Sequence, residues 1–428
     1  MKPDHSATEP PGDPIRSKII ETSPVYYGWI ILLAGTFGLI MTTPGQTVGV
    51  SVFLDKIIAE LDLSRSAVSL MYTLGTLIGS MSLPFVGRLI DRYGPRASVI
   101  FIAGLFALAC VWMGFVSGLV TLFIGFTLIR GLGQGALGLV SLHVINIWFV
   151  SRRGLAIGLA GVGFAAATAF FPLLIENLID HFDWRAAYML LGGLVALTIL
   201  PIGATFYRNH PERYGLRPDS SSTPKDQQPS QEANYNLGQA RRTLTFWLFT
   251  IGGFFVSALG TGLIFHHYSI MAESGLSRTV AATMFISFGF IMAAANLLTG
   301  VLMDRISPRY LLSASLALLG SSLFLAPHVG SPAMILVYGT LLGTMQGMSG
   351  AIQGSAYGYY FGRRNFGAIK GFATTITVAG TAVGPLLFAL GFEAFGAYGP
   401  ILALSAILPL LVAIGAPFIR LKRNGTVL

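Results

Sequence analysis

Five side chains that could hold a charge or move a proton lie within or beside long apolar stretches of this sequence. Arg130 stands well inside one stretch, and Gln134 follows it by one helical turn on the same face. His266 and His267 end a second stretch, and imidazole titrates near neutral pH. Glu176, near the end of a third, is the other candidate for proton coupling. We expect Arg130 to contact a solute and the histidines to couple a proton; a structural arginine and an interfacial histidine pair are the alternatives.

Further polar residues in the apolar stretches could line a path for a solute. Pro44 and Gly45 interrupt the first stretch, which frees backbone groups for a ligand or water. Amides and hydroxyls also join membrane helices to one another, at about 0.6 to 2 kcal/mol each, so packing is the alternative role. With Arg130, the predicted path residues of this kind are Gln46, Gln134, Asn296, Gln346, Thr374 and Thr377.

Helices that span a membrane must position these residues. Hydrophobic residues make up 53% of the 428 and charged residues 11%, less than half the share of about 25% in soluble domains. Most apolar stretches approach or exceed the roughly 20 residues that a helix needs to cross the hydrocarbon core. They give twelve spans, the first covering 26 to 50. We predict an all-α integral membrane protein with a tail (1–25) that is not a signal peptide, a six-helix half (26–206), a linker (207–242), a second six-helix half (243–419) and a short tail (420–428).

The two halves repeat each other at an offset of 213 residues. Residues 87–96 and 300–309 share the skeleton G-x-x-x-D-R-x-x-P-R, and Leu63-Ser64-Arg65 matches Leu276-Ser277-Arg278 in the same register. Many secondary transporters are built from two such repeats, with the solute path at the repeat interface.

The duplicated charged motif predicts a breakable latch. Asp91 and Arg92 stand where the second span ends, so the carboxylate can hold a neighbouring helix end when that face of the protein is closed. A basic turn with a structural ion pair is the alternative. The predicted gating residues are Gly87, Asp91, Arg92, Arg96, Gly300, Asp304, Arg305 and Arg309.

Basic residues are distributed unevenly between the two ends of the spans. Of the 27 Lys and Arg residues, 22 lie on the side of the duplicated motif and the linker, and four lie on the other side. Cytoplasmic loops carry such an excess, so we expect both termini in the cytoplasm and the chain in the cell inner (plasma) membrane. The net charge of +9 then reflects topology and contact with anionic lipid. We expect no nucleic-acid partner.

Other classes of function find no support in the sequence. Cys110 is the single cysteine, so an intrachain disulfide or a zinc–thiolate cluster cannot form. The sequence has no P-loop pattern for ATP, no clustered metal ligands and no Ser/His/Asp grouping inside the spans. We therefore expect neither an enzyme nor a cofactor, and no catalytic or metal site.

The paired G-x-x-x-D-R-x-x-P-R segments resemble the hallmark loop of the major facilitator superfamily. Arg130-Gly131-Leu132-Gly133-Gln134-Gly135 is similar to its R-x-x-x-Q-G element, and the resemblance covers about residues 26 to 419. It implies the major facilitator fold and transport by alternating access. It also implies that Arg130 supports helix packing and proton coupling.

Three segments resemble the oxalate/formate antiporter and monocarboxylate transporter branch: Tyr26-Tyr27-Gly28-Trp29, the P-E-x-x-G-L-x-P-D run at 211–219, and residues 242–247. Carboxylate carriers of this branch typically place a cation in the eighth span, and some place another in the eleventh. Here the two positions are Asn296 and, approximately, Thr377. Neither neutralises a carboxylate, and a buried dianion needs charged partners, so the resemblance favours a monocarboxylate over oxalate.

The sequence thus predicts a secondary active transporter that moves a small organic solute, a monocarboxylate-like anion with protons, and works as a monomer in the lipid bilayer. The alternatives are an efflux carrier for an amphipathic metabolite or drug, and a non-transporting sensor with a carrier fold. Export on overproduction identifies the first, and binding without flux identifies the second.

Overall fold

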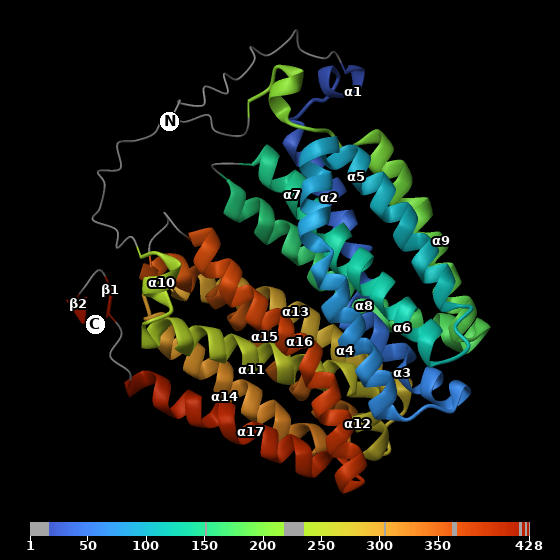
Figure 1. The fold of residues 1–428 in the computed structure, drawn as a ribbon, viewed down its shortest axis with the longest axis vertical. Coiled ribbons are helices and arrows are strands. Elements are labelled where there is room, and N and C mark those ends of the chain that lie inside the picture. The colour runs from blue at the N-terminus through green and yellow to red at the C-terminus, as the bar shows by residue number, and fades with distance from the viewer. Residues whose placement is uncertain are drawn as a thin grey trace.

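The computed structural model describes residues 17–149, 152–217, 235–303, 305–361, 366–418, 422–423 and 426–427 (Figure 1). Twelve helices within these ranges are long and apolar enough to cross a membrane. The all-α architecture predicted from the sequence is confirmed. Large apolar side chains such as Phe85, Leu108 and Leu197 are exposed on the outside of the bundle, where lipid would cover them.

The first half of the chain supplies six spans. Its main helices are α2 (Gly28–Ile40), α3 (Thr47–Leu61), α4 (Arg65–Met81), α5 (Leu83–Met113), α6 (Leu119–Leu128), α7 (Gly138–Trp148), α8 (Arg153–Phe182) and α9 (Trp184–Thr205). The short elements are α1 (Lys18–Glu21), the 3₁₀ turns η1 (Thr43–Gly45) and η3 (Pro211–Tyr214), and the π-helical segment η2 (Ile129–Leu137).

The second half repeats this plan. Its helices are α11 (Leu244–Phe265), α12 (His267–Glu273), α13 (Arg278–Leu302), α14 (Pro308–Leu325), α15 (Pro332–Phe361), α16 (Phe366–Phe395) and α17 (Tyr398–Gly415). The short elements are α10 (Leu237–Ala240), η4 (Ala326–His328), η5 (Ala416–Phe418) and a pair of two-residue strands, β1 (Lys422–Arg423) and β2 (Thr426–Val427).

Local sequence signals set several helix ends. Ser64 and Ser277, which the repeat places in equivalent positions, cap α4 and α13 by accepting from the backbone N–H three residues later. Gly94 has a φ of 79° within α5, a left-handed conformation that glycine adopts without strain, and it kinks α5 at the start of the third span, Arg92–Met113. The repeat thus fixes equivalent helix starts in both halves.

The first span is longer than the sequence predicts. It runs over Gly28–Leu61 rather than ending at residue 50. The sequence pattern gives an early end because Asp55 and Lys56 interrupt the apolar stretch. In the structure Asp55 lies on α3, inside the span, where other side chains neutralise it.

The halves meet mainly along two helix pairs, α4 with α16 and α8 with α13 (Figure 1). In addition, α3 of the first half packs against α11 and α12 of the second. Thr73 Oγ1 on α4 donates to the carbonyl of Ala382 on α16 at 2.6 Å. A Cβ at Gly289 on α13 would lie 2.5 Å from the carbonyl of Ala165 on α8, so these helices pack at backbone contact. We call the end of the bundle that carries α10 and the start of α2 the basic end, and the opposite end, with α12, the far end. The two groups of helices meet at the far end and diverge toward the basic end in Figure 1.

Candidate functional site

The first membrane span is broken near its middle, where Pro44 and Gly45 stand. The turn η1 separates α2 from α3. Gly45 lies directly against the carbonyl of Ile129 on η2, so closely that a Cβ at this position would collide with it. The break therefore presents the Gly45 carbonyl to side chains of η2.

Arg130 binds this carbonyl. Its Nη1 donates to Gly45 O at 3.0 Å and to Thr47 Oγ1 at 3.4 Å. Its Nε donates to Thr76 Oγ1 at 3.0 Å, and its guanidinium carbon lies 4.7 Å from the centre of the Tyr72 ring. The residue is only 3% exposed, so dipoles and an aromatic face, rather than water, stabilise its charge.

Two polar atoms beside these contacts are buried and have no hydrogen-bond partner among the described residues. They are Arg130 Nη2 and Gln134 Oε1. Both residues belong to η2, and π-helical segments inside membrane helices frequently mark functional sites. Because buried polar atoms are normally paired, a donor and an acceptor one turn apart suit a polar ligand.

The other predicted path residue of the first half lies at the same break. Gln46 donates from Nε2 to Thr42 Oγ1 at 3.1 Å. The structure therefore gathers Gln46, Arg130 and Gln134 around η1 and η2.

The remaining path residues lie in the second half. Asn296 on α13 donates from Nδ2 to the carbonyl of Gly347 at 3.2 Å, so it joins α13 to α15. Gln346 is half-buried on α15. Thr377 on α16 donates to the carbonyl of Thr374 at 2.9 Å, within its own helix. Asn296 Nδ2 and Thr377 Oγ1 thus serve helix contacts in this structure.

The two histidines are buried between helices. His266 Nε2 lies 2.8 Å from the carbonyl oxygen of Pro385, which accepts only, so this nitrogen carries the hydrogen. Its Nδ1 then accepts from the Tyr398 hydroxyl at 2.9 Å, and the neutral ring is fully satisfied. His267 Nε2 lies 2.8 Å from Ala281 O, while its Nδ1 is buried without a partner among the described residues.

The predicted latch residues lie at the basic end, as far as the structure describes them. Arg96 donates to the carbonyl of Ala204, at the end of α9, at 2.6 Å, and Arg92 covers the ring of Tyr93. Arg305 is exposed, and Arg309 covers the ring of Tyr310. No Cβ at Gly87 or Gly300 would meet a neighbour within 4 Å. Asp304 and the side chain of Asp91 lie outside the described residues.

An ionic network that sequence reasoning missed lies at the far end, where the halves meet. Arg278 donates from Nε to Glu176 Oε1 at 2.7 Å, and its Nη1 lies 3.5 Å from Asp55 Oδ2. Arg65 donates to Asp55 Oδ1 at 2.9 Å and to Ser269 Oγ at 2.5 Å. Asp55, Glu176 and Arg65 belong to the first half, and Arg278 and Ser269 belong to the second.

Comparison with known proteins identifies the family. The model of the Major Facilitator Superfamily matches residues 30–270 and again residues 250–426. The chain belongs to the major facilitator superfamily. The fold is similar to that of a solved structure, a bacterial homologue of the human lysosomal transporter Spinster in an inward-facing and occupied conformation. The two superpose with a TM-score of 0.68 over 91% of this chain and 95% of that one, at 17% identity.

Curated relatives place this superfamily member near carriers of small organic anions. It is 26% identical over 252 residues to the oxalate:formate antiporter of Oxalobacter formigenes, covering 59% of this chain and 57% of that one. It is 30% identical over 172 residues to human monocarboxylate transporter 6, covering 39% and 33%. Rat monocarboxylate transporter 4 aligns over 380 residues at 24% identity, covering 84% and 76%. The alignments thus span less than two thirds of the first two relatives.

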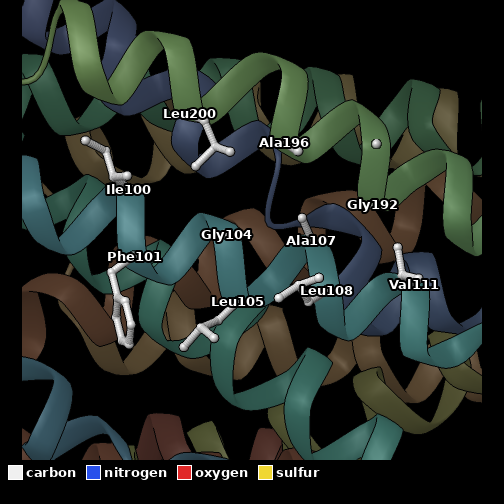
Figure 2. A pocket seen from close by; sticks show the side chains of 11 residues that line it. Ile100, Phe101, Gly104, Leu105, Ala107, Leu108, Val111, Gly192, Ala196 and Leu200 are labelled. Atoms are coloured by element: carbon white, nitrogen blue, oxygen red, sulfur yellow. The ribbon is translucent and has the colours of Figure 1, made fainter.

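A cavity of about 590 Å³ in this transporter lies between α5 and α9 (Figure 2). Only apolar side chains and glycines line it, and Phe101 at its edge is 58% exposed on the outside of the bundle. It offers an anion no hydrogen-bond donor. We therefore assign it to contact with lipid rather than to the solute path.

The sequence contains a signal for some residues of the ionic network and of the Arg130 site, but not for others. Arg65 and Arg278 stand at equivalent positions of the repeat, which singles them out as a pair. Asp55 carried no such signal, because its repeat counterpart is Tyr268. Tyr72 and Thr76, the neighbours of Arg130, look like ordinary residues of an apolar helix until the fold brings them together.

Proposed function

We propose that this superfamily member carries a monocarboxylate-like anion together with protons by alternating access. The names of its relatives support this solute class, and two of them are monocarboxylate transporters. The duplicated latch motif supports the mechanism, because rocking of two halves must make and break a few contacts at each end.

The observation that carries the proposal is that Arg130 Nη2 has no hydrogen-bond partner among the described residues. Its Nε and Nη1 are bound to the protein, which fixes the guanidinium, while Nη2 is buried and has no partner among the described residues. Both hydrogens on Nη2 are available to a carboxylate, and a charge-assisted bond of this kind is about twice as strong as a neutral one. One such cation matches one negative charge, which favours a monoanion.

Gln134 and Gln46 would complete the solute contacts on the side of η1 and η2. Gln134 Oε1 can accept from a hydroxyl or a protonated acid. Asn296, Gln346, Thr374 and Thr377 remain the proposed contacts from the second half, and each offers a neutral amide or hydroxyl. None of these adds the second positive charge that a dianion would require.

Proton coupling is proposed for Arg130 and the histidine pair. Of the two histidines, His267 is the better candidate, because its Nδ1 has no partner within the described ranges, while both ring nitrogens of His266 are already bonded. Replacing His267 by Gln should abolish proton-driven accumulation and leave exchange of solute between the two sides intact.

The positive-inside distribution supports an inner (plasma) membrane location with the basic end and both termini in the cytoplasm. The far end then faces outward. We propose that one chain suffices for transport, since both halves of the path are present in it.

The test is uptake by purified protein in liposomes under an imposed inward proton gradient. Labelled lactate, pyruvate, formate and oxalate are offered together with a neutral solute. We expect gradient-dependent accumulation of at least one monocarboxylate and little accumulation of oxalate. The same protein with Arg130→Gln should lose this uptake.

Two results of this uptake experiment would contradict the proposal, one its solute class and the other its proton coupling. Folded protein that accumulates none of the acids would favour export of an amphipathic metabolite or drug. Accumulation of such a compound inside inside-out vesicles, which corresponds to export from the cell, would then identify that function. Equal uptake with and without the gradient would exclude proton coupling while keeping the solute class.

A further inference from the structure

We propose that Asp55, Glu176, Arg65 and Arg278 form the outer gate of this carrier, a charged lock that holds the far end closed while the basic end is open. This rests on the proposed alternating access. It adds a set of gating residues at the end of the protein opposite the latch motif.

Arg278 makes the principal contacts between the halves. From α13 in the second half it binds Glu176 on α8 through Nε at 2.7 Å and through Nη2 at 3.2 Å. Its Nη2 also donates to the carbonyl of Val52 on α3, and its guanidinium carbon lies 4.7 Å from the centre of the Tyr268 ring. A two-point arginine–carboxylate pair is directional, so it forms only when the two helix ends are in register.

Asp55 links the second arginine, Arg65, to the same charged cluster. Both arginines converge on its carboxylate, Arg65 on Oδ1 and Arg278 on Oδ2. Ser269 of the second half donates to Oδ1 at 2.6 Å and accepts from Arg65 Nη1. Two positive and two negative charges therefore cancel within one cluster.

Burial makes this cluster sensitive to loss of any member. The Glu176 side chain is 5% exposed and that of Arg278 is 25% exposed, in contrast to the 49% of Glu60 at the same end of the protein. Separation of the halves would leave Glu176 and Asp55 on one side and Arg278 on the other. Charges buried to this degree are costly unless paired, so the pairs favour the closed far end.

The repeat supports a gate rather than a shared packing element. Arg65 and Arg278 are equivalent, but the equivalents of Asp55 and Glu176 in the second half are Tyr268 and Ala389. Both carboxylates thus come from the first half and pair across the interface with Arg278 of the second half. The second half has no carboxylates at the equivalent positions to make the reciprocal pairs with Arg65. An interaction needed only to fold each half would be expected in both copies.

The experiment measures the far end directly. Cys110 is replaced by Ala, and spin labels are attached at Ser117→Cys in the first half and Ala333→Cys in the second, both exposed at the far end. Distances are measured by pulsed EPR in lipid nanodiscs without solute. We expect Glu176→Gln and Arg278→Gln each to raise the ratio of long to short distances about tenfold, within the usual range for coupled conformational equilibria.

Two further variants separate a gate from a general structural role. Glu60→Gln breaks a salt bridge with Arg185 that lies within the first half, and it should leave the distances unchanged. The double variant Glu176→Gln/Arg278→Gln should shift the distances no more than Arg278→Gln alone, because Arg278→Gln already removes both the pair with Glu176 and the contact with Asp55. If either glutamine variant fails to fold, Glu176→Asp and Arg278→Lys replace it and should give a smaller shift in the same direction.

The proposal is overturned if the Glu176 and Arg278 variants keep the parent distances, or if Glu60→Gln shifts them equally. Because no solute is present, the outcome is independent of the proposed cargo. Shifted distances in a protein that takes up no acid would keep the gate and reject the cargo. Unchanged distances in a protein that takes up an acid would do the reverse.

Discussion

At the scale of single residues, Arg130 is held by three acceptors and an aromatic face, while its Nη2 has no partner in the part of the chain that the structure describes. Arg130→Lys keeps the positive charge but loses the planar guanidinium with its several N–H donors. The compact ammonium cannot bind the protein acceptors and the solute at the same time. A charge-assisted hydrogen bond is worth about 1.5 to 3 kcal/mol, so the KM for the transported acid should rise roughly ten- to hundredfold. Initial rates of uptake over a range of acid concentrations measure this.

The matched control for this residue is Arg241→Lys. Arg241 is exposed at the basic end and covers the ring of Phe372. The same chemical change there should leave the KM within about twofold, the scale of a surface substitution below about 0.5 kcal/mol. An unchanged KM in Arg130→Lys would assign Arg130 to packing alone.

At the scale of elements, the close approach of η1 to η2 positions the Arg130 site. Gly45→Ala would place a Cβ against the carbonyl of Ile129 and force η1 away, since backbone on both sides cannot yield. Overpacking of this kind typically costs about 1 to 3 kcal/mol, so we expect a lower Tm and weaker acid binding. Thermal unfolding in detergent, with and without the acid, measures both.

Gly104→Ala provides the comparison on α5, where nothing lies within 4 Å of the new Cβ. Alanine favours a helix over glycine by roughly 1 kcal/mol, so the Tm should stay the same or rise. A fall in Tm as large as that of Gly45→Ala would show that the substitution itself, and not the contact with η2, is responsible.

Elements also show what sequence can and cannot predict here. Length and apolarity predicted twelve spans, and Pro44 and Gly45 marked the break in the first. The end of that span was misplaced because a charged pair normally ends a membrane helix, while the partners that neutralise Asp55 include Arg278, far away in the other half of the chain. Side-chain partners set by tertiary contact leave no local pattern in the sequence.

At the scale of the whole molecule, transport requires the protein to alternate between a state closed at the far end and a state closed at the basic end. Neither state can therefore be much more stable than the other. Asp91→Asn weakens the proposed cytoplasmic latch and Glu176→Gln weakens the proposed outer gate, so the two changes should bias the protein in opposite directions. Asp91→Asn alone should slow flux and leave acid binding largely intact. Combined with Glu176→Gln, it should bring the far-end distances back toward those of the parent, because the two biases subtract. Pulsed EPR distances, acid binding and uptake rates measured on the parent, both single variants and the double variant provide the test. A double variant whose distances match Glu176→Gln alone would mean that Asp91 has no part in the conformational balance.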